Sequence, residues 1–135
     1  MAAEKIPMMM GTGRRVLVVE DDDSMRQAIE RVLNASGIAT AAYVSAEQLL
    51  AVGPVEGDAC IVSDLKLPKM SGLELLTELR SRGVCQPLIL ITAHDSPNVR
   101  KQAEQSGVAA YLAKPFLGHA LVAAVRAVMG PTKPS

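Results

Sequence analysis

The chain alternates between short runs of apolar residues and longer segments in which apolar residues recur every three or four positions. The short runs are typical of buried strands, and the longer segments are typical of amphipathic helices. The predicted strands are residues 15–19, 38–43, 59–63, 88–91 and 109–113. The predicted helices are residues 24–36, 45–52, 71–82, 96–106 and 116–129. Strands and helices that alternate with short connections predict an α/β fold, in which helices cover both faces of a parallel sheet.

The residues at the ends of these segments agree with this division. Asp23 or Ser24 is suited to cap the first helix, because each side chain can accept a hydrogen bond from the first turn, and Gly37 is suited to end it. The strand at 38–43 is rich in Ala and Thr and is predicted to lie at an edge of the sheet. The strand at 88–91 consists of branched aliphatic residues, which predicts that both of its faces are covered.

Length and composition predict a single globular domain. A chain of 135 residues, of which 49% are hydrophobic and 21% are charged, provides one core and is too short for two. We predict a disordered N-terminal extension at residues 1–13, the folded domain at 14–129 and a Pro-rich tail or linker at 130–135.

Charge and aromatic content argue against direct nucleic-acid binding by this domain. Lys and Arg together number 14, as do Asp and Glu, so the domain lacks the excess positive charge that such binding uses. One Phe, two Tyr and no Trp offer few rings on which bases could stack. No apolar run approaches the length of a membrane span, and the patch at residues 6–10 is too short for the core of a signal peptide.

The two cysteines have no spacing typical of a disulfide framework. Cys60 lies inside an apolar run and Cys85 lies just before another, so both are predicted to be buried or half-buried free thiols. Free thiols are usual in a reducing compartment, and we therefore expect a cytoplasmic protein that does not contact a membrane.

Polar residues that could bind a ligand or take part in a reaction follow four of the five predicted strands. The carboxyl ends of parallel strands lie along one edge of a sheet, which is where open α/β sheets place their sites. The residues at this edge are Glu20, Asp21 and Asp22 after the first strand, Asp64 after the third, Thr92 after the fourth and Lys114 after the fifth.

The carboxylates at this edge predict a cation site. Two unit charges about 4 Å apart repel each other by about 4 kcal/mol at an effective dielectric of about 20. Hard oxygen ligands with room for water suit Mg²⁺. A solvated acidic turn that favours the dipole of the following helix is the alternative for this block, and we expect Asp22 and Asp23 to cap that helix rather than bind metal.

Over roughly residues 14–129, the sequence resembles the receiver domains of bacterial two-component response regulators. The matching stretches are residues 18–22 (VVEDD), 63–72 (SDLKLPKMSG), 91–94 (ITAH) and 111–116 (YLAKPF). Two of these stretches look most like the regulators of nitrogen fixation and nodulation. The resemblance implies a flavodoxin-like (βα)5 fold, a three-layer sandwich around a parallel five-stranded sheet in the order 2-1-3-4-5.

The resemblance also implies a role for each residue at the sheet edge. Asp64 would be the phosphoacceptor, which takes a phosphoryl group from a sensor histidine kinase. Lys114 would pair with a phosphoryl oxygen, and the hydroxyl of Thr92 would bind another. The implied ligands of Mg²⁺ are Glu20, Asp21, Asp64 and the backbone carbonyl of Lys66. Such a domain is not an enzyme in the usual sense, because it catalyses only its own phosphorylation and dephosphorylation.

Further residues are implied in switching and in tuning. Tyr111 corresponds to the aromatic residue that swings inward when Thr92 follows the phosphoryl group. The responding face, made by the helix at 96–106, the strand at 109–113 and the final helix, pairs with its copy or meets an effector. At the site, small Ala93 would leave access, whereas Lys66 and His94 would tune the lifetime of the phosphoryl group.

Three other classes of protein fit these residues less well. A haloacid-dehalogenase-type enzyme also uses an Asp nucleophile with Mg²⁺, but it carries a second acid two residues later, where this chain has Lys66. A receiver-like binding module that has lost phosphorylation would lack one of the site residues, and none is missing. A nucleotide-binding loop is disfavoured because Gly11-Thr12-Gly13 precedes the first strand and lacks a third glycine.

Overall fold

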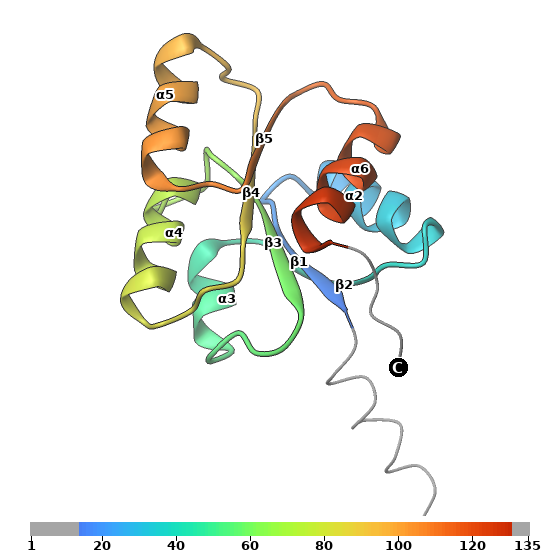
Figure 1. Ribbon diagram of the computed structural model, residues 1–135, viewed down its shortest axis with the longest axis horizontal. Helices are drawn as coiled ribbons and strands as arrows, with labels where there is room; N and C mark the ends of the chain where they lie inside the picture. Colours follow the sequence, from blue (N-terminus) through green and yellow to red (C-terminus); the bar gives the residue numbers. More distant parts are fainter. Residues whose placement is uncertain (1–13, 131–135) are drawn as a thin grey trace, which may run out of the picture.

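Five parallel strands form one sheet in the order β2-β1-β3-β4-β5 (Figure 1). The structure is a computed structural model that describes residues 14–130. The strands are β1 (Arg15–Val19), β2 (Ala39–Tyr43), β3 (Ala59–Asp64), β4 (Leu88–Thr92) and β5 (Ala110–Ala113). The predicted flavodoxin-like fold and the edge position of β2 are therefore confirmed. The predicted extension at 1–13 and the tail from 131 onward lie outside the described residues.

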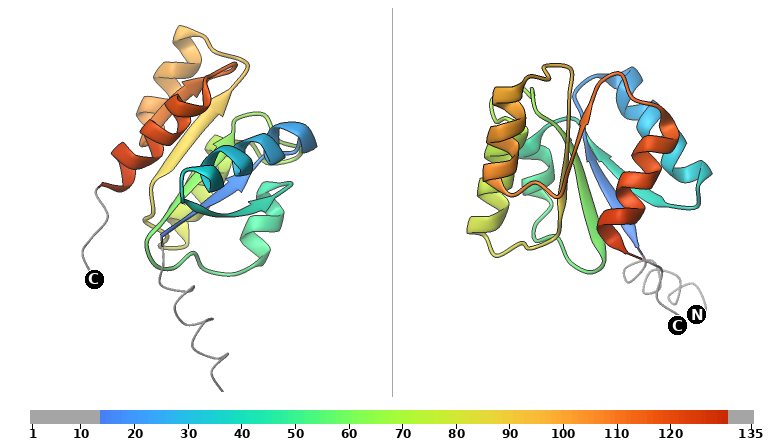
Figure 2. Two further views of the ribbon diagram at one scale, coloured as in Figure 1. Left: turned by 90° about the vertical axis from the view of Figure 1, so that its right-hand side faces the viewer. Right: turned by 45° about the horizontal axis from the view of Figure 1, so that its top comes forward.

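Helices cover both faces of the sheet and complete a three-layer sandwich (Figure 2). The helices are α2 (Asp23–Ala35), α3 (Ala46–Ala51), α4 (Gly72–Ser81), α5 (Pro97–Ser106) and α6 (Gly118–Met129). One buried apolar cluster joins the sheet to α3, α4 and α5, and a second joins its other face to α2 and α6. In the described part of the chain, no helix has the length and apolar character that crossing a membrane requires.

The side chains of β1 show how one strand serves both clusters. Leu17 and Val19 belong to the cluster on the α3–α5 face, whereas Val16 and Val18 belong to the cluster under α2 and α6. Successive side chains of a strand point to opposite faces, so a strand covered on both sides must be apolar throughout. This requirement explains why β1, β3 and β4 appear in the sequence as continuous apolar runs rather than as alternating ones.

The cap of the first helix and the start of the last helix differ from those predicted. Asp22, rather than Asp23 or Ser24, caps α2, because its carboxylate accepts a hydrogen bond from the backbone N–H of Met25 at 2.7 Å. The final helix begins at Gly118 instead of Phe116, since Leu117 has extended backbone angles and Phe116 packs against the cluster under α2 and α6.

Smaller differences concern the strands and the cysteines. Strands β3 and β4 each run one residue further than predicted, so that Asp64 and Thr92 are their last residues. Cys60 is buried and Cys85 is exposed, and both are free, so the prediction of burial is wrong for Cys85. Val84 occupies the buried position before β4 in its place. Burial raises the pKa of the Cys60 thiol to about 12.

Helix α4 is fixed against the end of β3 by its first residues. Ser71 and Glu74 form a capping box, in which each side chain accepts a hydrogen bond from the backbone N–H of the other residue. Gly72 follows the cap and is buried against the end of β3. A Cβ atom at this position would meet the carbonyl oxygen of Asp64 and would lie 2.9 Å from Cδ1 of Leu90. The helix therefore approaches the strand as closely as it does only because residue 72 has no side chain.

We predict that Gly72→Ala destabilises the domain by about 1–3 kcal/mol, the usual range for overpacking a filled interior. Ala has the higher intrinsic helix propensity, but the clash is with backbone, which cannot move aside as a flexible side chain can. Urea unfolding would measure the change, with exposed Thr77→Ala on the same helix as the matched control. An unchanged or increased free energy of unfolding for Gly72→Ala would contradict the prediction.

Candidate functional site

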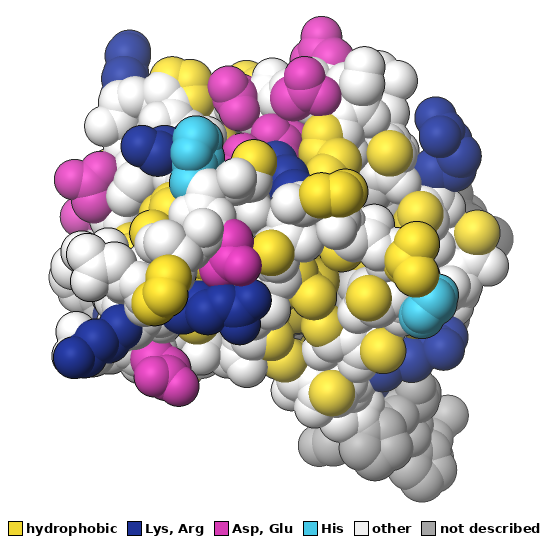
Figure 3. Space-filling model, turned by 90° about the horizontal axis from the view of Figure 1, so that it is seen from above, with side chains coloured by type: hydrophobic (Ala, Val, Ile, Leu, Met, Phe, Trp, Pro, Cys, Tyr) yellow, Lys and Arg dark blue, Asp and Glu magenta, His cyan; other side chains and the backbone are white. Residues whose placement is uncertain are grey.

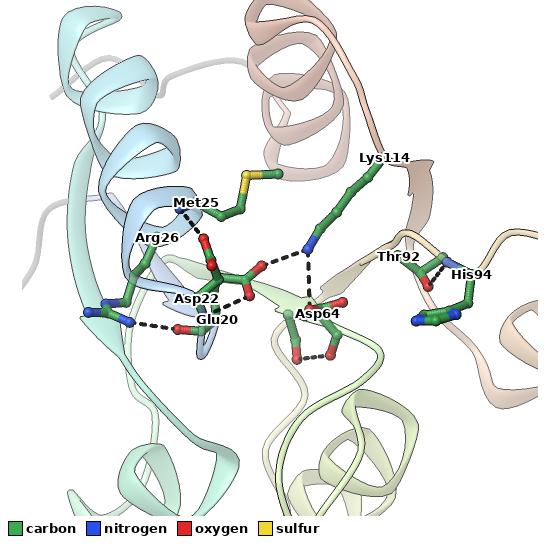
Figure 4. Close-up of polar contacts among 9 residues, drawn as sticks. Glu20, Asp22, Met25, Arg26, Asp64, Thr92, His94 and Lys114 are labelled. Carbon is green, nitrogen blue, oxygen red and sulfur yellow. Dashed lines mark hydrogen bonds and ion pairs between the residues drawn. The ribbon is translucent and has the colours of Figure 1, made fainter.

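The candidate site lies at the carboxyl edge of the sheet, where the ends of β1, β3, β4 and β5 meet (Figure 4). Strand β1 is followed by α2 on one face, and β3 is followed by α4 on the other. The loops after β1 and β3 therefore separate, as they do at the ligand-binding crevices of open α/β sheets. Glu20 and Asp21 enter this crevice from the end of β1, and Asp64 enters it from the end of β3.

Lys114 joins the acidic residues of two strands. Its Nζ atom lies 2.9 Å from Oε1 of Glu20 and 3.2 Å from Oδ2 of Asp64. All three side chains are largely removed from solvent, since the exposed fractions are 16% for Lys114, 1% for Glu20 and 10% for Asp64. One ammonium group thus offsets part of the repulsion between two buried carboxylates.

The burial of these charges acts on both members of the Glu20–Lys114 pair. Burial raises the pKa of Glu20, and the hydrogen bonds from Lys114 and from the Asp22 backbone reduce this effect without cancelling it. Burial opposes the charge of Lys114 as well, but its pKa is raised because its hydrogen bonds with Glu20 and Asp64 and its attraction to both outweigh that burial. Lys114 is therefore a cation throughout the neutral pH range.

Glu20 is held from three directions. Lys114 donates to one carboxylate oxygen, and the backbone N–H of Asp22 donates to the other at 3.1 Å. The guanidinium group of Arg26 donates to the backbone carbonyl of Glu20 at 3.0 Å and pairs with the carboxylate of Asp23 at 2.6 Å. Arg26, which the sequence analysis did not single out, thereby joins the first turn of α2 to the end of β1.

Three carboxylates of the cluster come close enough to share a metal ion. One oxygen atom from each of Glu20, Asp21 and Asp64 lies within 4.8 Å of the other two. The all-oxygen character of this set suits Mg²⁺, and exposed Asp21 leaves one side open to water. Asp22 caps α2, as predicted, whereas Asp23 pairs with Arg26 instead of capping the helix.

Thr92 is placed beside this cluster with its hydroxyl already engaged. The side chain is buried, and its Oγ1 atom accepts a hydrogen bond from the backbone N–H of His94 at 2.9 Å. Figure 4 shows Thr92 and His94 on the side of Asp64 that faces away from Glu20. Ala93, His94 and Lys66, which follow the ends of β4 and β3, are exposed.

Tyr111 lies apart from the acidic cluster, on the α5 side of β5. Its hydroxyl donates a hydrogen bond to Oδ1 of Asp95 at 2.9 Å, and the guanidinium carbon of Arg100 lies 4.9 Å from the centre of its ring. The structure thus brings Glu20, Asp21, Asp64 and Lys114 together and leaves Tyr111 half-buried, apart from them. Asp95 and Arg100 gave no signal in the sequence, because local spacing does not show which strand residue a loop residue will meet.

Comparison with known proteins places this geometry in a family. Residues 16–126 match the family model described as the response regulator receiver domain. The transcriptional regulatory protein FixJ of Azorhizobium caulinodans is 40% identical over 115 residues, which are 85% of this chain and 54% of that protein. The nodulation protein W of Bradyrhizobium diazoefficiens is 36% identical over 110 residues, which are 82% of this chain and 48% of that protein. This chain spans about half the length of such relatives.

Solved structures agree with these matches. The crystal structure named FixJ-N has a TM-score of 0.81 and 28% identity, and the alignment covers 92% of this chain and 99% of that one. A response regulator receiver protein from Burkholderia phymatum has a TM-score of 0.75 and 37% identity, with coverage of 91% and 100%. Both alignments extend over nearly all of the other chain.

We predict that Mg²⁺ stabilises the folded domain and that Asp21→Asn removes most of this effect. A ligand that binds only the folded state adds about 1.4 kcal/mol when its free concentration is about ten times Kd. The measurement is the Tm with and without Mg²⁺, with exposed Asp23→Asn in the same loop as the matched control. If Asp21→Asn and Asp23→Asn kept the same Mg²⁺-dependent rise in Tm, the cluster would not be the binding site.

Proposed function

This chain belongs to the response regulator receiver domain family, and from that premise we propose that Asp64 accepts a phosphoryl group from a sensor histidine kinase in a Mg²⁺-dependent reaction. The observation that carries the proposal is the position of Lys114, whose ammonium group contacts the carboxylates of both Asp64 and Glu20. A nucleophilic carboxylate, a fixed cation and further oxygen ligands are the groups that phosphoryl transfer requires, because its catalysis consists mainly of positioning and charge stabilisation.

In the proposed step, an oxygen of Asp64 forms a bond to phosphorus while the bond between phosphorus and the histidine nitrogen of the kinase breaks. The electron pair of that bond remains on the imidazole. Lys114, already 3.2 Å from Asp64, stabilises the charge on a phosphoryl oxygen as a point charge. The hydroxyl of Thr92 binds a second oxygen. The carboxylates of Glu20, Asp21 and Asp64 and the carbonyl of Lys66 would hold Mg²⁺, which when bound neutralises the charge of the transferring group.

The surface around the site supports docking by a partner such as the kinase. In the view onto the carboxyl edge of the sheet, hydrophobic side chains lie next to acidic ones (Figure 3). Leu117, three residues after Lys114, is 67% exposed, and Met25 and Phe116 are half-buried. An apolar area of this kind beside the reacting carboxylate would bury on docking and align the donor with Asp64.

Phosphorylation would act on the face made by α5, β5 and α6. A phosphoryl group brings about −1.5 to −2 charges to the site, which is enough to bias a loop between two positions. Thr92 and Tyr111 would carry this change to the face, where it controls homodimer formation or contact with an effector. This function would be carried out in the cytoplasm and without enzymatic turnover of other substrates. Two relatives, FixJ and the C4-dicarboxylate transport protein DctD, are named as transcriptional regulatory proteins, so an output of that kind would belong to the longer protein.

A binding module that has lost phosphorylation is the alternative. Such a module has no need to hold three carboxylates and an ammonium group together, because charges taken out of water cost stability unless they are paired. The retention of the whole set supports the phosphoacceptor instead.

We predict that the wild-type chain gains one phosphoryl group when it is incubated with acetyl phosphate and Mg²⁺, and that Asp64→Asn gains none. Intact mass measures the gain. Asp58→Asn is the matched control, since this acidic residue pairs with Arg14 just before β1, at the opposite end of the sheet, and should be phosphorylated normally. A wild-type chain that takes up no phosphoryl group with any divalent metal would favour the binding module.

We also predict that Lys66→Ala shortens the lifetime of the phosphorylated chain. Lys66 is exposed two residues after Asp64, where its ammonium group can pair with the phosphoryl group and hinder water. An exposed ion pair worth up to about 1 kcal/mol corresponds to at most about a fivefold change in the decay rate. The decay is followed by intact mass after removal of the phosphodonor, with exposed Lys101→Ala as the control. Equal decay rates for the wild type and Lys66→Ala would contradict a protective role of Lys66.

A further inference from the structure

Three polar side chains form a closed cluster outside the acidic crevice. Oδ1 of Asp95 accepts one hydrogen bond from Nε of Arg100 and another from the hydroxyl of Tyr111, both at 2.9 Å. Oδ2 of Asp95 accepts a third from the guanidinium group of Arg100 at 3.1 Å. The same guanidinium group lies over the ring of Tyr111, 4.9 Å from its centre. Each member of this cluster, called the Asp95 cluster below, therefore contacts both of the others.

Tyr111 packs partly against the apolar cluster on the α3–α5 face, and polar contacts hold its hydroxyl end. Tyr111 borders a hollow of about 580 Å³ between α5 and β5, which is lined by Arg100, Ala103 and Val108 among others. A side chain beside an open hollow has room for another position, so its orientation depends on its specific partners. The hydrogen bonds from Arg100 and then from Tyr111 keep the pKa of Asp95 below its usual value, and the carboxylate is therefore ionised at neutral pH.

The Asp95 cluster is linked through the backbone to the phosphorylation site. The N–H of His94, the residue just before Asp95, donates to the hydroxyl oxygen of Thr92. Residues 93–95 lie between Thr92 and the cap of α5 at Ser96. Among them, His94 contacts Thr92 at the site, and Asp95 contacts Tyr111. A displacement of Thr92 toward a phosphoryl group would pull on the segment that holds Asp95.

We propose that Asp95 is a positioning residue that holds Tyr111 at the surface with the help of Arg100, and so restrains the chain from adopting its phosphorylated arrangement. This inference rests on the proposed function, because it concerns how readily Asp64 is phosphorylated. If an outward and an inward position of Tyr111 exchange, the contacts with Asp95 favour only the outward one. Removing them raises the share of the inward position and, with it, the rate at which Asp64 takes up phosphoryl groups.

The test is the rate of phosphorylation by acetyl phosphate and Mg²⁺, followed by intact mass. Tyr111→Phe removes only the hydroxyl, and Asp95→Ala removes the acceptor while leaving the Ser96 cap of α5 in place. Exposed hydrogen bonds of this kind predict an increase of about two- to tenfold for each variant. Since both variants break the same contact, the double variant should be no faster than the faster single one. Glu104→Gln, which alters the same hollow without touching the cluster, should match the wild type.

A spectroscopic readout follows the position of Tyr111 itself. The chain has two tyrosines and no tryptophan, so in a Tyr43→Phe background the fluorescence comes from Tyr111 alone. We expect phosphorylation to change this emission in the background chain, and Asp95→Ala to produce the same change without phosphorylation.

The outcomes separate the two proposals. A wild-type chain that is not phosphorylated overturns the proposed function, and with it this inference. A wild-type chain that is phosphorylated at Asp64, together with Tyr111→Phe and Asp95→Ala that are no faster, overturns the role of Asp95 alone. Faster phosphorylation of both single variants, a double variant that adds nothing, and the expected change in emission support it.

Discussion

The contact of one ammonium group with two buried carboxylates is the constraint on which the rest of this structure depends. Glu20 and Asp64 come from neighbouring strands, and their charges are taken out of water at the same edge of the sheet. Such a pair is tolerable only with a fixed partner, and Lys114 supplies it from β5, two strands beyond β3. The relative register of β1, β3 and β5 is therefore tied to this point, since a slip of any of these strands would separate the charges.

The same arrangement explains why the loops that follow β1 and β3 are held closely against the strand ends. Backbone and side-chain donors fix the orientation of Glu20, and a side chain at residue 72 would press on the carbonyl of Asp64. By contrast, the loop after β4 holds its residues by a few polar contacts beside an open hollow. The site thus combines a rigid half, which holds the reacting groups, with a half that has room to move. Domains that respond to a small chemical change need both properties.

How far the sequence predicts this structure depends on the range of the interaction concerned. Continuous apolar runs and glycines locate the strands and helix ends, and the polar residues after each strand identify Glu20, Asp21, Asp64 and Lys114 as neighbours, because parallel topology brings strand ends together. Local spacing cannot decide between adjacent residues as a helix cap, so the sequence left Asp22, Asp23 and Ser24 as candidates, and the structure shows that Asp22 is the cap. It is equally silent about contacts between segments far apart in the chain, such as the one between Asp95 and Tyr111.

The unequal burial of the two thiols has a practical consequence. Cys60 lies within the central strand β3 with its pKa raised to about 12, while Cys85 is exposed in the loop that leads into β4. That loop is at the amino edge of the sheet, the full length of a strand away from Asp64. A maleimide dye or spin label would therefore attach to the native sequence at one known point, with no cysteine introduced or removed. Cys85 of the native domain is thus a labelling position for distance measurements between copies or toward a partner. A label there leaves the reacting groups unchanged.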